Sequence, residues 1–544
     1  MDYKKIFCWT LIFLAGAIWI FTVALTSVQS IEPSDLGLVS KMPPYFWIGL
    51  TLLGFLFYAG RESKEYLFIA FFFTVLYLFV APAIIREPVW LSNSFYPFAE
   101  SMLINNFGHL MYRLNAPLFS YIRWPVFLYF SSAFTLITNL PHAIILKYFP
   151  TFTIFLFGLL TLLILKVKLE TQYAIFGAAW LLSSFWLRQQ YFGPQGLAYI
   201  FFLMFLLLLS WIFFSNKSSK RRFTALLIFL FTVIVMTHVL TAIMSLIAVF
   251  ALYLTQKLIT KSNSLSIELV LLLLTIFFAS TLFASQTFSF TVKKVYRSLS
   301  GIGGLSIYHE SKRIIGSPAN DLNYLSSWTS VLLNVALAMV SMLFLLKDIV
   351  SRKKEKDEMG IFYAVMLCLF GVFALTMQYG SHEAYQRAFM FGLIPLTYLC
   401  IKLLKNRPKI LVAFLMILFF LNFPAQYGAD SFRLASESQL AGAKFTANSL
   451  PKGSSCFDEL SLYVRHYGPL KRIRFKALIK LPFTSFPKKE EVNEAMNKVE
   501  YIVLSDLQEK YYLYYLGENP LNQVDFNGLN RIYDNGNFSV LKHP

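Results

Sequence analysis

The chain has 544 residues, of which 57% are hydrophobic, 18% aromatic and only 14% charged. A soluble domain carries about 25% charged residues, so the composition excludes an ordinary soluble protein and indicates a membrane protein with interfacial aromatics. The formal net charge is +19. We expect no nucleic-acid partner, because the Lys and Arg residues cluster in short loops and no basic face is interleaved with a recognition motif.

Long apolar stretches recur along the first 424 residues, and only the last part of the chain escapes the pattern. A span needs about 20 apolar residues, and the clearest candidates are Ile6–Val28, Tyr66–Ile85, Leu197–Phe214, Ile267–Ser285 and Tyr324–Leu346. The first stretch is longer than the core of a signal peptide and lacks a small-x-small cleavage site. We therefore interpret it as a permanent span.

Basic loops between the spans predict the topology. The loops that we place in the cytoplasm contain Lys4 and Lys5, Arg61 and Lys64, Lys217–Arg222, Lys257 and Lys261, Lys347–Lys356, and Lys402–Lys409. The run Phe223–Leu258 is too long for one helix, and we expect a break near Thr237–Thr241. Two cytoplasmic loops must be separated by an even number of membrane crossings, but five apolar runs lie between the loops at Arg61 and Lys217. One of these runs therefore does not cross. We choose Trp124–Leu140, which five polar residues interrupt, and expect a re-entrant segment or half of a broken helix.

These patterns predict an α-helical polytopic membrane protein with about 13 spans. We expect a transmembrane domain over residues 1–424 and a small external α/β domain over residues 425–544, with the N-terminus in the cytoplasm. In the tail, Glu437–Leu450 has helical periodicity, and Ser454–Phe457, Tyr501–Leu504 and Phe538–Leu541 are typical of strands. The Asn535-Gly536 pair predicts a hairpin with a type I′ turn.

Three predicted external loops are long enough to hold chemistry: Gln29–Pro44, Arg86–Arg123 and Gln286–Asn323. The second loop contains Glu87, Asn93, Tyr96 and Glu100, then Gly108-His109 as a helix stop, then Tyr121-Ile-Arg123-Trp-Pro125 where the chain re-enters lipid. A loop that bears carboxylates and leads into an amphipathic helix (Phe95–Phe107) suits a substrate with an apolar tail and a polar head.

This loop and the overall layout resemble the GT-C superfamily of membrane glycosyltransferases, which take sugars from polyprenyl-phosphate carriers. The layout is similar to that of prokaryotic members of the archaeal type. Many prokaryotic members have Asp-x-Tyr-x-His followed by Glu, a Gly at the helix end, and Tyr-x-x-Trp-Pro. The resemblance implies substrate-binding roles for Asn93, Tyr96, His109, Tyr121 and Arg123.

The chain departs from the family pattern at two positions. Asn93 stands where the family has its catalytic Asp, and an amide is no general base and a poorer metal ligand. We therefore expect Glu100 or Glu87 to act as the base, with a water-facing carboxylate or a solvated pair with Arg86 as the structural alternatives. The Trp-Trp-Asp motif of oligosaccharyltransferases is absent, since Trp328 is followed by Thr329 and Ser330, which disfavours transfer to protein.

Further polar residues at external ends of spans are candidate substrate contacts. Gln195 follows a Gly-Pro helix break, His238 lies between two Thr residues, and Lys312, Arg313 and Arg387 break the positive-inside trend. Basic side chains would bind a carrier phosphate, and the resemblance implies this role for Arg387 above all. The structural alternatives are a plain turn, a helix-packing histidine, a solvated loop and an interfacial arginine.

The leading hypothesis is an inverting glycosyltransferase that moves a sugar from a polyprenyl-phosphate-linked donor to a glycan or protein acceptor at the outer face of the cell membrane. The alternatives are a non-catalytic relative that binds lipid-linked glycans, favoured by Asn93, and a lipid-linked glycan transporter, for which no inverted repeat is visible. The sequence does not identify a cofactor. A divalent cation is compatible with the pattern, and Glu32 and Asp35 are its candidate ligands, although their segment is also typical of a simple turn.

Overall fold

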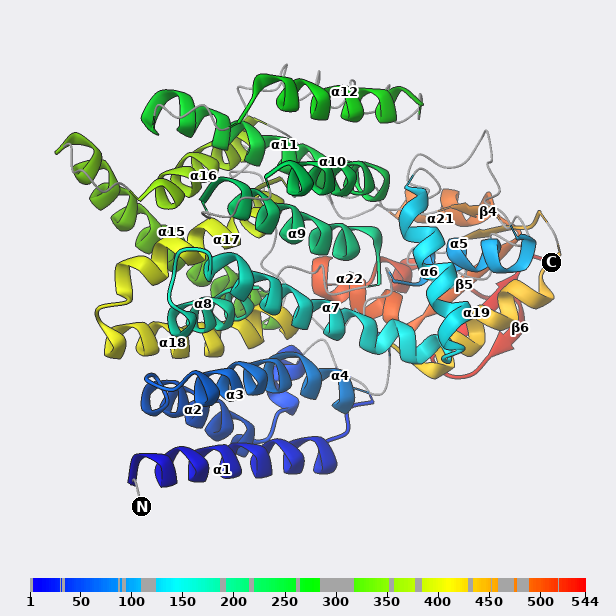
Figure 1. The fold of residues 1–544 in the computed structure, drawn as a ribbon. Helices are drawn as coiled ribbons and strands as arrows, with labels where there is room; N and C mark the ends of the chain where they lie inside the picture. Colours follow the sequence, from blue (N-terminus) through cyan, green and yellow to red (C-terminus); the bar gives the residue numbers. More distant parts are fainter. Residues whose placement is uncertain are drawn as a thin grey trace.

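The computed structural model describes residues 3–29, 31, 35–86, 89–90, 94–108, 124–185, 192–214, 220–260, 265–283, 318–351, 357–376, 384–428, 434–451, 453–457, 474–476, 489–516 and 518–544. It is a layered bundle of helices with a small mixed sheet at one end (Figure 1). Of the described helices, nine are long and apolar enough to cross a membrane. The protein is a multi-pass membrane protein, and the total of about 13 spans stays a prediction.

The helices of the bundle follow one another in chain order. They are α1 (Tyr3–Leu25), α2 (Pro44–Ala59), α3 (Lys64–Val75), continued by a π-helical turn (Leu76–Val80) into α4 (Ala81–Ile85), α5 (Phe95–Phe107), α6 (Pro125–Thr138), α7 (His142–Leu165), α8 (Thr171–Ser184), α9 (Pro194–Phe214), α10 (Lys220–Thr237), α11 (Val239–Leu254), α12 (Ile267–Phe283), α15 (Pro318–Val350), α16 (Glu358–Thr376), α17 (Ala384–Leu404) and α18 (Pro408–Tyr427). Several begin at Pro, whose fixed φ and missing N–H suit the first helical position.

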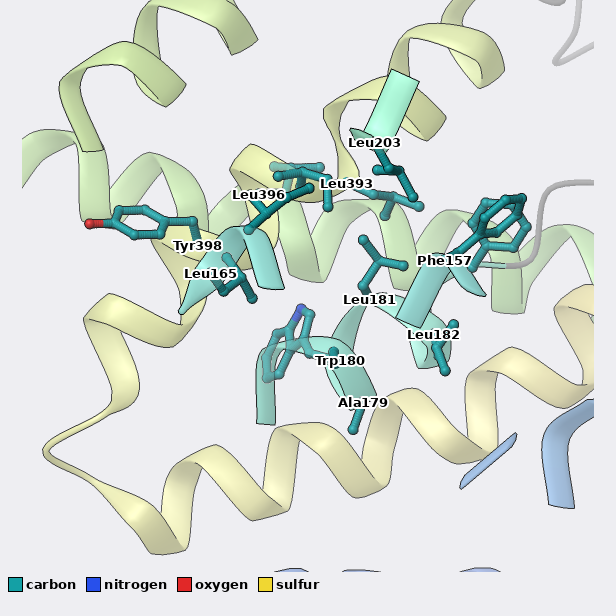
Figure 2. Packing of buried hydrophobic residues seen from close by; sticks show 14 of the residues in the cluster. Phe157, Leu165, Ala179, Trp180, Leu181, Leu182, Leu203, Leu393, Leu396 and Tyr398 are labelled. Carbon is teal, nitrogen blue, oxygen red and sulfur yellow. The ribbon is translucent and has the colours of Figure 1, made fainter. Parts of the chain in front are cut away.

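The core of the bundle lies between α7, α8, α9 and α17, where large apolar side chains interlock (Figure 2). Trp180 of α8 is fully buried there, and its indole Nε1 donates to Asn334 Oδ1 of α15 at 2.7 Å. A buried polar group needs such a partner in an apolar medium. This hydrogen bond therefore fixes α8 against α15, which otherwise exposes most of its apolar surface.

Two details of the predicted helices are confirmed. The run from Phe223 breaks at His238, between α10 and α11. Gly108 ends α5 in a left-handed conformation with φ 72°, and its N–H donates to Ile104 O. Gly adopts this conformation at no steric cost, which makes it a good helix stop.

The segment Trp124–Leu140 contains one continuous helix, α6, of 14 residues. That it does not cross the membrane stays a prediction. Its length of about 21 Å is less than the hydrocarbon thickness of about 30 Å. Its Ser131 and Ser132 face α5, while Leu136 and Ile137 are exposed. The serines that suggested a break are thus satisfied by a neighbouring helix.

The C-terminal module, defined here as the described residues from Leu434 onward, is α/β. It contains β2 (Leu434–Ala435), α19 (Glu437–Ser449), β3 (Ser455–Phe457), β4 (Arg474–Lys476), α21 (Lys489–Asn497), β5 (Tyr501–Ser505), α22 (Asp506–Leu516), β6 (Asn530–Asp534) and β7 (Phe538–Lys542). The sheet order is β4-β3-β5-β7-β6, with β3 parallel to β4 and β5, and β7 antiparallel to β5 and β6.

The predicted tail helix and three predicted strands are present, and so is the hairpin. The type I′ turn is wrong, because that turn needs positive φ at both central residues. Among the described residues of the hairpin only Gly536, with φ 88°, has it. Asp534 pairs with Ser539 across the hairpin, so the connection is longer than two residues.

The two ends of the bundle carry different groups of segments. At one end, β1 (Val89–Trp90) pairs with β2 of the module, and Asn323 donates to the carbonyl oxygens of Pro424 and Ala425. At the other end, Lys4 and Gln172 both contact Glu62. The described residues β1 and Asn323, which belong to two of the predicted external loops, therefore lie at the end that bears the module (Figure 1).

Candidate functional site

Arg387 and Gln195 form the centre of a polar cluster at the module end of the bundle. Arg387 lies in the first turn of α17, and its Nη1 donates to Oε1 of Gln195, the second residue of α9, at 2.6 Å. Gln195 is 3% exposed, and its Nε2 has no hydrogen-bond partner among the described residues. An unsatisfied buried donor costs about 1–3 kcal/mol, so this amide favours a ligand that offers an acceptor oxygen.

The register of α9 and α17 brings these two side chains together. Tyr199, one turn after Gln195, donates its hydroxyl to Met390 O at 3.0 Å, and both residues are fully buried. Phe202 packs edge-on against Phe391 with ring centroids 4.9 Å apart. These neutral contacts hold the two helix starts side by side, so the approach of Arg387 to Gln195 does not depend on their own hydrogen bond.

His238 joins the cluster from the break between α10 and α11. It is the N-cap of α11, and its Nδ1 accepts from Thr241 N at 3.4 Å and lies 3.0 Å from Thr241 Oγ1. Burial and the positive charge of Arg387 both lower the pKa of His238. The imidazole is therefore neutral, and because Nδ1 accepts, we assign the ring proton to Nε2 as a donor.

Trp124 completes the cluster from the residue before α6. Its ring lies 6.2 Å from the His238 ring, between centroids, at an angle of 41°. The cluster therefore combines a guanidinium, an amide, an imidazole and an aromatic surface from four separate segments. Cationic and neutral N–H donors beside an aromatic ring suit an oxyanion attached to a sugar or a lipid.

Glu100 is the one predicted catalytic residue whose side chain the structure describes. It lies on α5 and is 5% exposed, so the alternative of a water-facing carboxylate is wrong. Phe98 is also buried, with its ring 5.6 Å from that of Phe192. Phe98 therefore packs against protein rather than on the membrane surface.

Ser94 ties this helix to the polar cluster. It is fully buried immediately before α5, and its Oγ accepts from Phe192 N at 3.2 Å, two residues before α9 begins. Two turns further along α5, the hydroxyl of Ser101 lies 2.8 Å from that of Ser131 on α6. The start of α5 is thus fixed between α6 and the segment that leads to Gln195.

The structure brings Gln195, His238 and Arg387 together, as predicted substrate contacts at external ends of spans. Asp35 is 2.7 Å from Lys41 and forms an ion pair with it. The remaining predicted residues, Glu32, Glu87, Asn93, His109, Tyr121, Arg123, Lys312 and Arg313, lie outside the described residues, as does the side chain of Tyr96. Sequence reasoning missed Ser94 and gave Trp124 only as part of a motif, although its place before Pro125 at a helix start was a usable signal.

The comparisons with known proteins identify the fold. The sequence matches no protein-family model and no curated protein. Among solved structures, the Archaeoglobus fulgidus oligosaccharyltransferase in complex with Zn and sulfate has a TM-score of 0.51 and 13% identity, over 88% of this chain and 73% of that one. The same enzyme tethered to an acceptor peptide containing the NVT sequon has a TM-score of 0.47 and 11% identity, over 92% and 74%.

This chain shares the fold of that archaeal oligosaccharyltransferase. The shared fold agrees with the resemblance to the GT-C superfamily and its archaeal-type members. The absent Trp-Trp-Asp motif remains a difference from oligosaccharyltransferases, and the position that we compared with it, Trp328, lies within α15 rather than in an external loop.

The described residues do not assemble a metal centre. No group of three His, Cys, Asp or Glu side chains gathers among them, and Asp35 is engaged with Lys41. The donors that the cluster offers are N–H groups, which bind anions rather than cations. The chemistry available to these residues is therefore the binding of an oxyanion.

Proposed function

We propose that this protein is a GT-C-type membrane glycosyltransferase that takes a sugar from a polyprenyl-phosphate carrier and transfers it to a glycan or protein acceptor at the outer face of the cell membrane. One observation supports the proposal: Arg387 donates to Gln195 and lies near His238 at one end of a GT-C-type bundle, and the buried Gln195 Nε2 has no partner among the described residues. A phosphate that remains attached to a lipid lies at the height of helix ends, where the basic side chain is.

The proposed chemistry follows from the charges. As the bond between the anomeric carbon and the phosphate oxygen breaks, negative charge develops on the leaving phosphate. Arg387 would neutralise it, and the Nε2 groups of Gln195 and His238 would donate hydrogen bonds to it. A carboxylate, for which we propose Glu100 or Glu87, would take the proton of the acceptor hydroxyl as the new bond forms. Attack opposite the leaving phosphate inverts the anomeric carbon.

The class of acceptor is the second part of the proposal. The archaeal enzyme is an oligosaccharyltransferase by name, but at 13% identity the likeness concerns the fold. Because the Trp-Trp-Asp motif is absent, we favour a hydroxyl acceptor on a glycan over an asparagine of a protein. Glycan analysis decides between them: a deletion strain would lose a sugar from a glycan chain in the first case and from glycoproteins as a whole in the second.

The orientation is part of the proposal. We place the module end outside, because the basic loops at the other end follow the positive-inside rule. Labelling of a cysteine in the module tests this orientation. The native Cys456 is unsuitable because its side chain is fully buried, so we choose the exposed Asn522. In Asn522→Cys, an impermeant maleimide should label intact cells as strongly as lysed cells. Labelling only after lysis would reverse the topology.

The experiment that tests the function uses purified protein in nanodiscs and polyprenyl phosphate as the probe. Wild-type protein should bind the probe, Arg387→Ala should bind it much more weakly, and the deletion strain should lack one sugar by mass spectrometry. An intact lipid-linked glycan that accumulates inside the cell would instead indicate a transporter. Probe binding without any loss of sugar would indicate a non-catalytic lipid-glycan binder.

A further inference from the structure

The C-terminal module contacts the candidate catalytic loop directly. Val89 of β1 pairs with Ala435 of β2, and Trp90 pairs with Leu434, in an antiparallel ribbon. Glu87 lies two residues before β1 in the sequence, and Asn93 and Ser94 follow it closely. A ribbon of two residues is too short to be stable by itself. β1 also contacts α7, and its pairing with β2 connects it to the C-terminal module.

β2 is held through the start of α19. A capping box joins Ser436 and Gln439, with Ser436 Oγ accepting from Gln439 N at 3.3 Å and Gln439 Oε1 accepting from Ser436 N at 3.1 Å. The buried Gln439 also donates its Nε2 to Asp506, the first residue of α22. The chain direction between β2 and α19 is thus fixed, because both functions of one amide are used.

The hairpin between β6 and β7 holds the same point from the other side. Asn535 Nδ2 donates to Ser438 O at 2.7 Å, and Asn537 Nδ2 donates to Ser438 Oγ at 3.0 Å. Asn535 Oδ1 also accepts from Asn537 N at 3.3 Å, so the turn itself orients the donating amides. Gly442 packs directly against Phe538 one turn further along α19, where a Cβ would come within 2.2 Å of that ring.

We propose that Asn535 and Asn537 are positioning residues for the candidate catalytic loop. They form a latch on Ser438 that positions the start of α19, and through the pairing of β2 with β1 they position β1, which precedes α5 in the sequence. Their role in turnover rests on the proposed function, whereas their control of β1 does not. A merely structural latch would stabilise the module and leave β1 unchanged.

The experiment uses the full-length protein in nanodiscs with both asparagines replaced by Ala, and Asn527→Ala as the matched control. Asn527 is an exposed asparagine of the same module whose hydrogen bond runs through its backbone N–H. In the latch variant we expect hydrogen exchange at Val89 and Trp90 to accelerate about 10-fold, while Cys456 stays protected from thiol reagents. We expect kcat to fall about 10- to 100-fold with an unchanged KM for the donor.

A cross-link separates the proposal from general destabilisation. Val89 and Ala435 are directly opposite, a spacing that suits a disulfide, so Val89→Cys with Ala435→Cys should form one on oxidation. The background carries Cys368→Ser, since Cys368 is exposed. Oxidation should restore slow exchange at Trp90 and the lost kcat in the latch variant, and reduction should remove both gains.

Unchanged exchange at Val89 and Trp90 in a folded latch variant would overturn the proposal, and so would a cross-link that restores nothing. If neither wild type nor any variant transfers sugar, the proposed function fails, and the exchange measurements still decide whether the latch controls β1.

Discussion

Two polar clusters lie at opposite ends of the same bundle, and their basic side chains have different partners. At the module end, Arg387 donates to Gln195, a neutral amide, at 2.6 Å. At the other end, Lys402 forms an ion pair with Asp357, whose Oδ1 also accepts from the Tyr398 hydroxyl at 3.0 Å. The second cluster contains its own counter-charge, whereas the amide of the first does not cancel the charge of the guanidinium.

The difference separates a structural ion pair from a binding site. A lysine beside a carboxylate stabilises its own neighbourhood and attracts little else. Gln195, which accepts from Arg387, keeps a buried Nε2 that has no partner among the described residues, and this donor favours an anion. Among the carboxylates, Asp357 forms an ion pair with Lys402, and Glu100 is buried on α5.

The largest effect should come from Glu100→Gln, which tests whether the Glu100 carboxylate is the general base. The amide keeps the shape and removes the base, so transfer should fall about 10²- to 10⁴-fold. The assay measures product by mass spectrometry for Glu100→Gln, Glu87→Gln and Asn93→Asp side by side. Full activity in both Gln variants would move the base to Glu32 or Asp35. An inert wild type that gains turnover with Asn93→Asp would make the natural protein a non-catalytic relative.

Arg387→Ala should weaken binding of polyprenyl phosphate by about 1.5–3 kcal/mol, the range of one charged hydrogen bond, or about 10- to 150-fold in Kd. Tyr199 and Met390 keep α9 and α17 in register, so the variant should fold. Arg387→Lys should recover only part of the affinity, because an ammonium lacks the planar fork. An unchanged Kd in nanodiscs would reduce Arg387 to an interfacial arginine.

Gln195→Glu places a carboxylate beside Arg387, as Asp357 lies beside Lys402 in the second cluster. The new carboxylate would lie at the site of the present 2.6 Å hydrogen bond and cancel the charge of Arg387. Affinity for polyprenyl phosphate should fall about 10-fold, and by more than in Gln195→Leu, which removes only the amide. If Gln195→Glu binds more tightly than Gln195→Leu, the charge of Arg387 does not attract the ligand.

The smallest effect should come from Asp357→Asn. It removes the counter-charge of Lys402, whose side chain is 32% exposed and can reach water. We expect unchanged transfer and a loss of stability of at most about 1 kcal/mol, measured as a small fall of the unfolding temperature in detergent. A large loss of transfer would mean that the second cluster also serves the reaction.

Much of the architecture was determined by the sequence alone. Apolar length fixed the spans, since nothing else in the chain can satisfy a membrane interior. The break at His238 followed from a run too long for one helix, and the tail helix, strands and hairpin followed from local periodicity and an Asn-Gly turn. The helix end at Gly108 was also local, because glycine alone adopts its positive φ without strain.

Only the tertiary structure decided the rest. The convergence of Gln195, His238 and Arg387 depends on the register of α9, α11 and α17, which buried contacts such as Tyr199 to Met390 set over 191 residues of chain. The partners of the α6 serines also required the tertiary structure, because Ser101 and Asn105 of α5 supply them. The β1–β2 ribbon has two residues on each side, too few to leave a periodic pattern, so only the tertiary structure shows that these two segments pair.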